Sequence, residues 1–276
     1  LRLGKLVVLK ADRRTLSAKP EVLRREVDAL KNLSHTYIPQ VYDFLTEDGV
    51  VYTVMDYIEG ESLDKPLKRG ERFPQAAVVT WACQLLEALV YLHSRPPHGI
   101  LHSDIKPANI MVTAQGDIRL IDFNIALALG EEGAVRVGFS RGYASPEHYG
   151  IDYSNVGVTR GVQDDVVTRL DDGPATVLPS SSGSSTTGRR TVVLDVRSDI
   201  YSVGATLYHL FTGRRPAQDA KEVEPISGQE VSPAVAAIIR KAMAPDPGQR
   251  WQTAEEMLRA FEHLHDNDPR MKRHKR

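Results

Sequence analysis

The sequence has only one cysteine, Cys83, and almost no net charge, and each scarcity removes a class of protein. A single thiol excludes an internal framework of disulfides. With a formal net charge of −1, the chain offers no basic surface for nucleic acid, so we expect no nucleic-acid partner. It also lacks a signal peptide and an apolar run of about 18 residues that could cross a membrane, which predicts a cytoplasmic location.

What remains is the composition of a soluble globular enzyme without internal repeats. The 276 residues, 41% of them hydrophobic, are enough for two lobes with separate cores. Residues 75–93 predict a core helix in which Cys83 is a small buried hydrophobic residue. The apolar face of this helix comprises Val78, Leu85, Leu86, Leu89 and Leu92. Residues 197–202 are predicted to open a strongly apolar helix over residues 203–211, which Gly213 ends. Further helices are predicted after the N-cap pair Ser232-Pro233 and from the capping box at residues 253–256.

The most informative segment is the run HSDIKPAN at residues 102–109, which is followed by DFN at residues 122–124. Asp104 can orient an attacking hydroxyl and accept its proton, and Lys106 can neutralise charge on a moving phosphate. Asn109 and Asp122 offer the hard oxygen ligands that Mg²⁺ prefers. Together these groups suit phosphoryl transfer from a metal-bound nucleotide.

The local pattern predicts how these side chains come together. Two apolar runs, at residues 110–112 and 118–121, flank a turn at residues 115–117. A hairpin at this place brings Asn109 close to Asp122, and residues 100–101 predict a short strand before the acid. The acids and the amide then share one site at the ends of strands.

These motifs resemble the catalytic loop and the metal-binding loop of the eukaryotic-type protein kinase family, in its bacterial serine/threonine branch. The resemblance implies a two-lobed α+β fold with a small β-rich N-lobe, a larger α-rich C-lobe, and ATP bound between them with Mg²⁺ or Mn²⁺. It also implies catalytic roles for Asp104, Lys106 and Asn109, and metal binding by Asn109 and Asp122. Lys106 is typical of kinases that phosphorylate Ser or Thr of proteins, so we expect such an enzyme in bacterial signalling.

The resemblance extends to the nucleotide site. Lys10, at the end of the run VVLK, resembles the strand lysine that holds the phosphates, and Glu26 resembles its ion-pair partner on the next helix. Residues 51–57 resemble the strand and hinge that join the two lobes. Three hinge residues would border the adenine, the last two through their backbone: Met55, Asp56 and Tyr57.

In the large lobe, the run GYASPE at residues 142–147 is similar to the segment that closes the activation loop. The resemblance implies that Ser140 helps to seat the acceptor hydroxyl and that Glu147 pairs with Arg250. It also implies that Asp199 hydrogen-bonds the backbone of the catalytic loop, although a helix-capping Asp is an alternative explanation.

Three departures from the family carry expectations. Only nine residues precede Lys10, so the glycine-rich loop over the phosphates is lacking and weaker nucleotide binding is expected. Asn124 stands where glycine is usual, and Asn tolerates positive φ well. Ser103 replaces the arginine that binds a phosphorylated activation loop, and residues 123–139 contain neither Ser nor Thr. We therefore hypothesise that activity does not require activation-loop phosphorylation.

The resemblance divides the chain into an N-lobe at 1–57, C-lobe parts at 58–153 and 192–265, an insertion at 154–191 and a basic tail at 266–276. The insertion is rich in Ser and Thr and is predicted to be disordered, because it cannot bury a core. Its Thr168, with an acid three residues on, is similar to ligands of forkhead-associated domains and could become a docking site by autophosphorylation. The tail is typical of a stretch beside a membrane anchor.

Two alternatives stay open from the sequence. A pseudokinase that binds partners is favoured by Ser103 and Asn124 but opposed by the presence of Lys10, Asp104 and Asp122. A small-molecule phosphotransferase shares the His-x-Asp pattern, but the GYASPE run and Lys106 favour a protein kinase.

Overall fold

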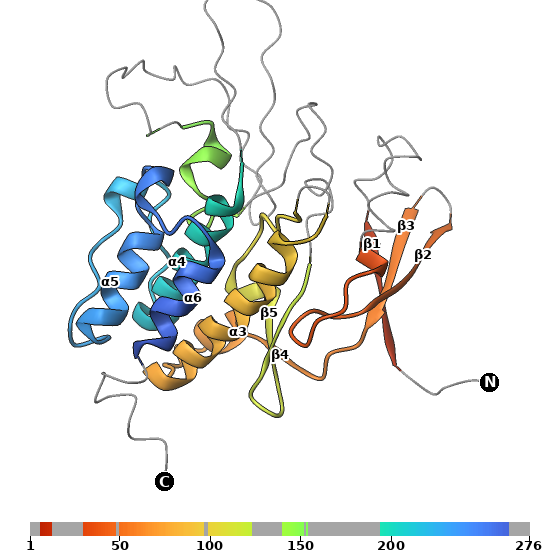
Figure 1. Cartoon of the computed structure of the whole chain (residues 1–276). Coiled ribbons are helices and arrows are strands. Elements are labelled where there is room, and N and C mark those ends of the chain that lie inside the picture. The colour runs from red at the N-terminus through yellow and green to blue at the C-terminus, as the bar shows by residue number, and fades with distance from the viewer. Residues whose placement is uncertain are drawn as a thin grey trace, which may run out of the picture.

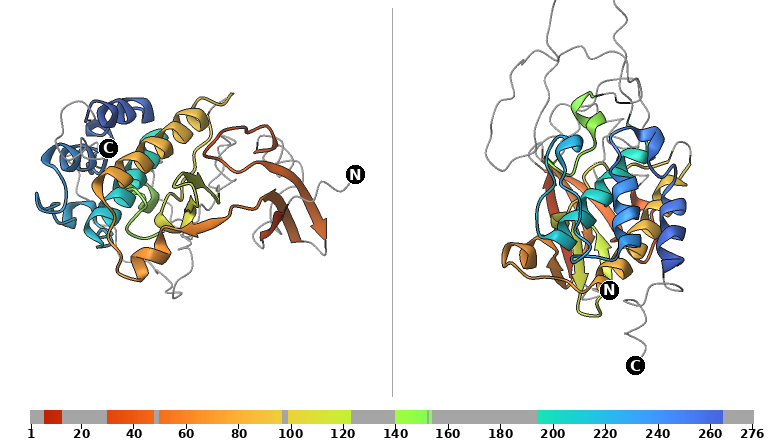
Figure 2. Two further views of the ribbon diagram at one scale, coloured as in Figure 1. Left: turned by 90° about the horizontal axis from the view of Figure 1, so that it is seen from below. Right: turned by 90° about the vertical axis from the view of Figure 1, so that its left-hand side faces the viewer.

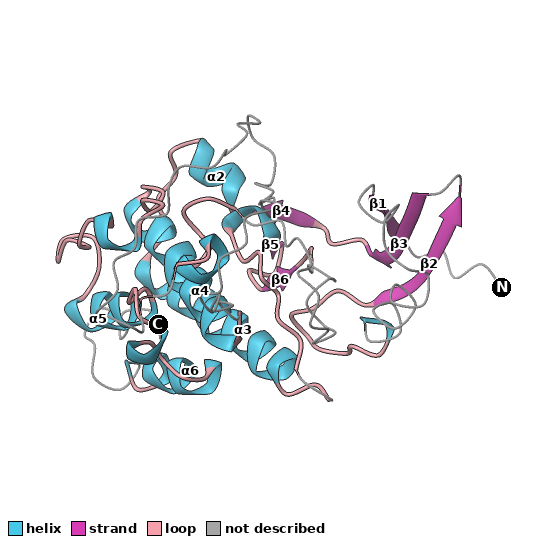
Figure 3. Cartoon of the chain, turned by 90° about the horizontal axis from the view of Figure 1, so that it is seen from above, coloured by secondary structure: helices cyan, strands magenta, loops and turns pink. Residues whose placement is uncertain are grey.

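The computed structural model describes residues 6–12, 30–47, 50–96, 99–122, 140–151, 153 and 194–264. These residues form a β-sheet at one end of the molecule and a group of helices at the other, with a second small sheet between them (Figures 1 and 3). This arrangement confirms the α+β class that the sequence predicts.

The first sheet comprises β1 (Val7–Asp12), β2 (Val41–Glu47) and β3 (Val50–Asp56), in the antiparallel order β1-β3-β2. In its register Lys10 pairs with Thr53 and Val8 pairs with Met55. Because paired residues and residues two apart share a face, Lys10 and Met55 lie on the same side of the sheet. The sheet therefore presents a cation and an apolar thioether to one face.

The second sheet comprises β4 (Gly60–Ser62), β5 (Ile110–Thr113) and β6 (Ile118–Leu120), in the antiparallel order β4-β5-β6. The predicted hairpin is confirmed, because Ile110 pairs with Leu120 and the Thr113 N–H donates to the Asp117 carbonyl at 2.9 Å. The predicted strand at residues 100–101 was wrong. There the Ile100 N–H donates to the Leu92 carbonyl at 3.0 Å, which ties this segment to a helix end instead of a sheet.

The helical part contains α2 (Asp64–Lys68), α3 (Gln75–His93), α4 (Val196–Thr212), α5 (Pro233–Ala242) and α6 (Ala254–Glu262). Single-turn helices are η2 (Pro107–Asn109), η4 (Pro146–Tyr149), η5 (Ala220–Glu222) and η6 (Pro247–Gln249). Helices α3, α4, α5 and α6 pack side by side (Figure 2), and α4 lies in contact with both α3 and α5. The central position of α4 leaves nearly all of its side chains buried.

The helix ends follow local capping chemistry. The Asp195 side chain accepts from the Arg197 N–H at 2.8 Å, so α4 begins at Val196, within one residue of the predicted opening at Arg197. It ends at Gly213, whose φ of +64° is the left-handed conformation expected after a helix C-terminus. At α6 the Thr253 hydroxyl accepts from the Glu256 N–H at 3.1 Å, as a capping box requires. Ser232 occupies the N-cap position of α5 but makes no side-chain cap bond.

Helix α3 is the core helix predicted over residues 75–93. Among the described helices, α3 alone has the length and apolar composition needed to span a membrane. By these two criteria the prediction that the sequence lacks such a run was wrong. Half of its apolar window is nevertheless buried within the fold, with Val78, Leu86 and Leu92 completely enclosed. Cys83 is partly buried among these residues, and burial raises the pKa of its thiol to about 12. The thiol is therefore protonated and unreactive at neutral pH.

Candidate active site

A buried carboxylate fixes the start of the catalytic loop. Asp199, in the first turn of α4, accepts hydrogen bonds from the backbone N–H groups of His102 at 2.9 Å and Ser103 at 2.8 Å. Its Oδ2 also lies 2.9 Å from Nε2 of His93, at the end of α3. Burial alone would raise the pKa of Asp199, but the hydrogen bonds from His93 and the His102 backbone hold it below its usual value. Ser103, held in this way, adopts a positive φ of 63°.

The loop places an acid, an amine and a hydroxyl in mutual contact. Lys106 Nζ lies 2.7 Å from Asp104 Oδ2 and 2.7 Å from Ser140 Oγ, and the Ser140 hydroxyl donates to Asp104 Oδ1 at 2.8 Å. Asn109 Nδ2 donates to the Asp104 carbonyl at 2.8 Å and lies 3.1 Å from Asp104 Oδ2. Both oxygens of the Asp104 carboxylate are thereby held in one orientation, as a positioned general base requires.

The hairpin brings the two proposed metal ligands to one place. The Ile121 N–H donates to the Asn109 carbonyl at 2.9 Å, which sets Asp122 beside the catalytic loop, and Asp122 has a positive φ of 61°. In the described part of the chain no three His, Cys, Asp or Glu side chains form a complete metal cluster. One carboxylate and one amide oxygen nevertheless suit Mg²⁺, which takes most of its remaining ligands from water and substrate phosphates.

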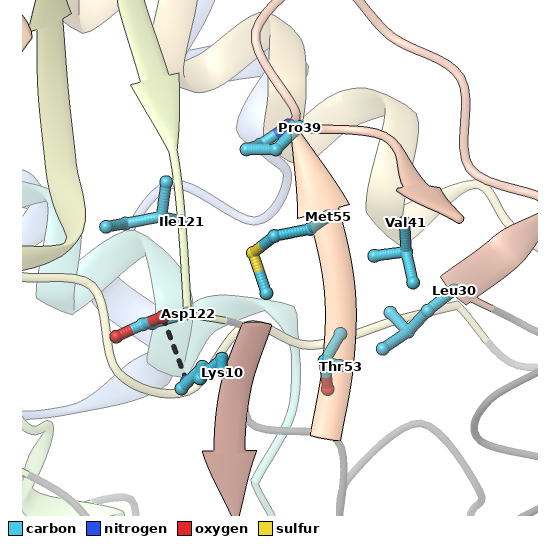
Figure 4. Close-up of a pocket in the computed structure, with 8 residues that line it drawn as sticks. All are labelled: Lys10, Leu30, Pro39, Val41, Thr53, Met55, Ile121 and Asp122. Atoms are coloured by element: carbon cyan, nitrogen blue, oxygen red, sulfur yellow. Dashed lines mark ion pairs between the residues drawn. The ribbon is translucent and has the colours of Figure 1, made fainter. Parts of the chain in front are cut away.

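The pocket at the predicted nucleotide site lies between the first sheet and the hairpin (Figure 4). Lys10 Nζ on β1 lies 2.9 Å from Oδ1 of Asp122, the second residue after β6. The lining also includes the apolar side chains of Leu30, Val41 and Met55, and the hollow has a volume of about 30 Å³. This volume holds about one water molecule. A larger molecule can enter this hollow only if the ion pair between Lys10 and Asp122 opens.

The side chains of the predicted hinge differ in their surroundings, and that of Asp56 stabilises the local backbone. The Asp56 carboxylate accepts from the Gln40 N–H at 3.0 Å and from the Tyr42 hydroxyl at 2.6 Å, and the Asp56 N–H donates to the Gln40 carbonyl at 3.0 Å. The side chain of Tyr57 is 52% exposed. Of the three predicted hinge residues, only Met55 has a side chain that lines the pocket.

Glu147 and Arg250 form a buried, two-pronged ion pair, with N–O distances of 2.7 and 2.9 Å. The Arg250 side chain is fully enclosed and also donates to the backbone carbonyls of Ala244 at 2.7 Å, Pro245 at 2.9 Å and Arg197 at 3.1 Å. It therefore ties η4, at the end of the activation segment, to α4 and to the loop before α6.

Two polar residues of α3 support the site although the motifs did not single them out. His93 holds Asp199, as described above, and the Gln84 side chain clamps the hairpin turn. Gln84 donates to Asp117 Oδ1 at 2.6 Å and accepts from the Ile118 N–H at 3.0 Å. The available signal was a glutamine on the apolar face of a core helix, where a polar group needs a partner.

Several predicted features lie outside the described residues: Glu26, Asn124, Thr168, the insertion at residues 154–191 and the tail at 266–276. The Lys10–Glu26 pair and the phosphothreonine site therefore stay predictions. The described residues bring together Lys10, Met55, Asp104, Lys106, Asn109, Asp122 and Ser140, with Asp199 behind the catalytic loop.

The comparisons with known proteins agree with this geometry. A probable serine/threonine-protein kinase from Streptomyces coelicolor is 29% identical over 97% of this chain and 37% of its own length. The serine/threonine-protein kinase PknB of Mycolicibacterium smegmatis is 30% identical over 96% of this chain and 40% of its own. The chain thus spans about 40% or less of the length of these relatives.

A solved structure shows the same fold. A variant of the PknI kinase domain of Mycobacterium tuberculosis superposes with a TM-score of 0.62 at 22% identity, over 93% of this chain and 84% of that one. The protein kinase domain family matches residues 3–159, which is more than half of the sequence. With this match and a site of the kind described, the chain belongs to the protein kinase domain family.

Proposed function

We propose that the protein is a Mg²⁺-dependent serine/threonine protein kinase that acts in bacterial signalling and works at the cytoplasmic side of the cell. Membership of the family implies ATP and a divalent metal as reactants and cofactors, and proteins as substrates. One observation carries the proposal: Asp104, Lys106 and Ser140 contact one another at 2.7 to 2.8 Å, beside Asn109. That cluster fits a hydroxyl nucleophile approaching a phosphate.

In this mechanism the acceptor hydroxyl lies against Asp104 and gives its proton to the carboxylate as its oxygen bonds to the γ-phosphorus. The bond from that phosphorus to the bridging oxygen breaks, and ADP leaves. Lys106 stabilises the charge on the transferring group, and Lys10 holds the other phosphates. When bound at Asn109 and Asp122, Mg²⁺ would neutralise charge on the phosphates.

The test is phosphate transfer from Mg-ATP by the full-length protein to itself and to a generic protein acceptor, with the modified residues identified by mass spectrometry. We expect phosphoserine and phosphothreonine, lost on chelation and restored by Mg²⁺. Phosphate found only on tyrosine would contradict the acceptor class. Transfer to an aminoglycoside but to no protein would favour a small-molecule phosphotransferase, and ATP binding without transfer would favour a pseudokinase.

Replacing Lys10 with Met is expected to lower the transfer rate roughly 100-fold, because one preorganised donor to the phosphates is lost. The change also removes the 2.9 Å partner of Asp122. Steady-state kinetics at varied Mg-ATP would measure it. Lys68→Met is the control, since Lys68 is exposed and, among the described residues, forms its ion pair with Asp64 on α2. Equal losses in the two variants would contradict the role of Lys10.

We also propose that activity is independent of activation-loop phosphorylation. Ser103 is 3% exposed and its backbone is held by Asp199, so this position offers no guanidinium to receive a phosphate. Phosphatase-treated protein should therefore start at full rate, and a lag that ends with phosphate on the activation segment would contradict this.

The docking of a forkhead-associated domain on phosphorylated Thr168 belongs to the same proposal. Its test is a peptide map of the protein after incubation with Mg-ATP, in which phosphate on Thr168 is expected. A map that covers Thr168 and shows no phosphate there would remove this partner. A membrane anchor beside the basic tail stays a sequence-based prediction.

A further inference from the structure

Three arginines from separate segments gather beside the acceptor site. Arg72 lies in the loop between α2 and α3, Arg141 directly follows Ser140 in the activation segment, and Arg215 follows α4. Ser140 itself contacts Asp104 and Lys106 at 2.8 and 2.7 Å. Burial raises the pKa of Tyr149, and the nearby charges of Arg141 and Arg215 both oppose that rise. The charges of Arg215 and Arg72 both act on His209. The three positive charges therefore lie in one region of the surface, next in sequence and in space to Ser140.

Direct contacts join Arg141 and Arg215. Arg215 Nε donates to the Arg141 carbonyl at 2.9 Å, and its guanidinium carbon lies 5.1 Å from the centre of the Tyr143 ring. Gly142, which lies between Arg141 and Tyr143 in the sequence, has a left-handed φ of +78°. A methyl group there would be 3.3 Å from Arg215 Nε and 2.7 Å from the Pro216 carbonyl, so the close approach requires glycine.

Arg72 comes from a different segment and lies close to the end of α4, near His209. Its guanidinium packs on Gly213, where any side chain would collide with it. His209 Nδ1 lies 2.6 Å from the hydroxyl of Tyr143, the residue on whose ring Arg215 packs. Burial lowers the pKa of His209 to about 4, with further lowering from the nearby charges of Arg215 and Arg72. The imidazole is therefore neutral at physiological pH, and the arginines supply the positive charge.

This charge has no counterion in the described part of the chain. Arg72, Arg141 and Arg215 are exposed, and none of them lies within ion-pair distance of a described carboxylate. The exposed arginines Arg69, Arg214 and Arg259, by contrast, each pair with Glu. Asp64 is the carboxylate whose charge is felt by Tyr143, where it helps burial to raise the tyrosine pKa. This carboxylate already pairs with Lys68 at 3.0 Å and accepts from the Ser62 hydroxyl at 2.5 Å.

Gathering like charges without a partner costs free energy, and it also focuses a positive potential on one surface. Guanidinium groups bind carboxylate and phosphate in two-pronged fashion, and stack on aromatic rings at the same time. We propose that Arg72, Arg141 and Arg215 select protein substrates that carry an anionic side chain close to the phosphorylated Ser or Thr. This inference rests on the proposed kinase function and names its substrate class.

The anion can be the carboxylate of Asp or Glu, or the phosphate of a residue phosphorylated earlier. Four peptides with one Ser acceptor distinguish them, with Glu, Gln, Lys or phosphoserine at the residues on both sides of that acceptor. We expect kcat/KM to be about tenfold higher for the Glu peptide than for the Gln peptide, which corresponds to the binding of one well-placed charge. A still higher kcat/KM for phosphoserine identifies phosphate as the preferred ligand, and an equal or lower one identifies carboxylate.

Reversing the charge of two of these arginines distinguishes a role in substrate selection from a role in the fold. The double variant Arg72→Glu with Arg141→Glu should lose the preference for Glu and prefer the Lys peptide, a switch that damage to the fold cannot produce. Arg240→Glu is the matched control, because Arg240 is exposed on α5, away from the site, and its reversal changes charge alone. It should keep the wild-type order of peptides.

Two results would overturn the inference and leave the kinase function standing: equal kcat/KM for the Glu and Gln peptides, or an unchanged Glu preference in the double variant. A lack of transfer to every peptide and to a generic protein acceptor would overturn the kinase function, and the inference with it.

Discussion

Asparagine in place of Asp104 is expected to lower phosphate transfer by about 10³-fold or more, with little change in stability or nucleotide binding. The two side chains have nearly the same shape, so the contacts with Ser140 and Asn109 can persist, but an amide cannot accept the proton of the acceptor hydroxyl. General bases contribute about 10²–10⁴-fold to rates, and Asp104 also orients the hydroxyl.

The measurement is kcat with a protein acceptor, beside the affinity for Mg-ATP and the midpoint of thermal unfolding. Asp43→Asn provides a control of the same chemistry, because Asp43 is a half-exposed carboxylate on β2 that pairs with Lys31 at 2.6 Å. A variant at Asp104 that keeps wild-type kcat would refute its role as general base. Loss of ATP binding in that variant would show instead that the substitution disturbs the site.

Local pattern was enough for the parts of this site that lie close together in the sequence. The hairpin from β5 to β6 follows from two apolar runs around a Gly-Asp turn, and it brings Asn109 beside Asp122. Helix α3 is recognised from apolar spacing alone. Both elements are specified by neighbours within one segment, and their partners are hydrophobic or backbone groups whose positions follow from periodicity.

Contacts between distant segments were not accessible in this way. His93 contacts Asp199, which is 106 residues away, and Arg215 contacts the Arg141 carbonyl, which is 74 residues away. Arg72 comes close to the end of α4 at Gly213 only in the folded chain. At residues 100–101 the sequence predicted a strand that the structure does not contain. A short apolar run can form its backbone hydrogen bonds with a helix end as well as with a strand. The exact first residue of α4 depends on one capping side chain, Asp195, which the sequence does not distinguish from other Asp residues.

The second large effect is expected at the buried pair of Glu147 and Arg250. Replacing Arg250 with Met should lower the free energy of unfolding by about 3–5 kcal/mol, because a carboxylate is left buried without its partner. The same change removes the donors to the carbonyls of Ala244, Pro245 and Arg197, which then lose hydrogen bonds inside the protein. Urea unfolding measures this difference directly.

Arg259→Met on α6 is the control for this experiment. Its pair with Glu255 has a similar N–O distance, 2.6 Å, but both side chains are more than half exposed, at 64% and 56%. Such a pair contributes about 0–1 kcal/mol, so this variant should unfold almost like the wild type. Similar losses in the two variants would mean that burial does not set the strength of the Arg250 pair.

Catalysis should fall together with stability in the Arg250 variant, because Glu147 belongs to the segment that begins at Ser140. The turn from Ser140 through Tyr143 leads into η4, and Glu147 in η4 is held by Arg250. Adding Glu147→Leu to Arg250→Met removes the stranded charge and should recover part of the stability, since apolar replacement of both partners is often neutral. If stability returns but transfer does not, the ion pair positions the activation segment for catalysis; if both return together, its contribution is to the fold alone.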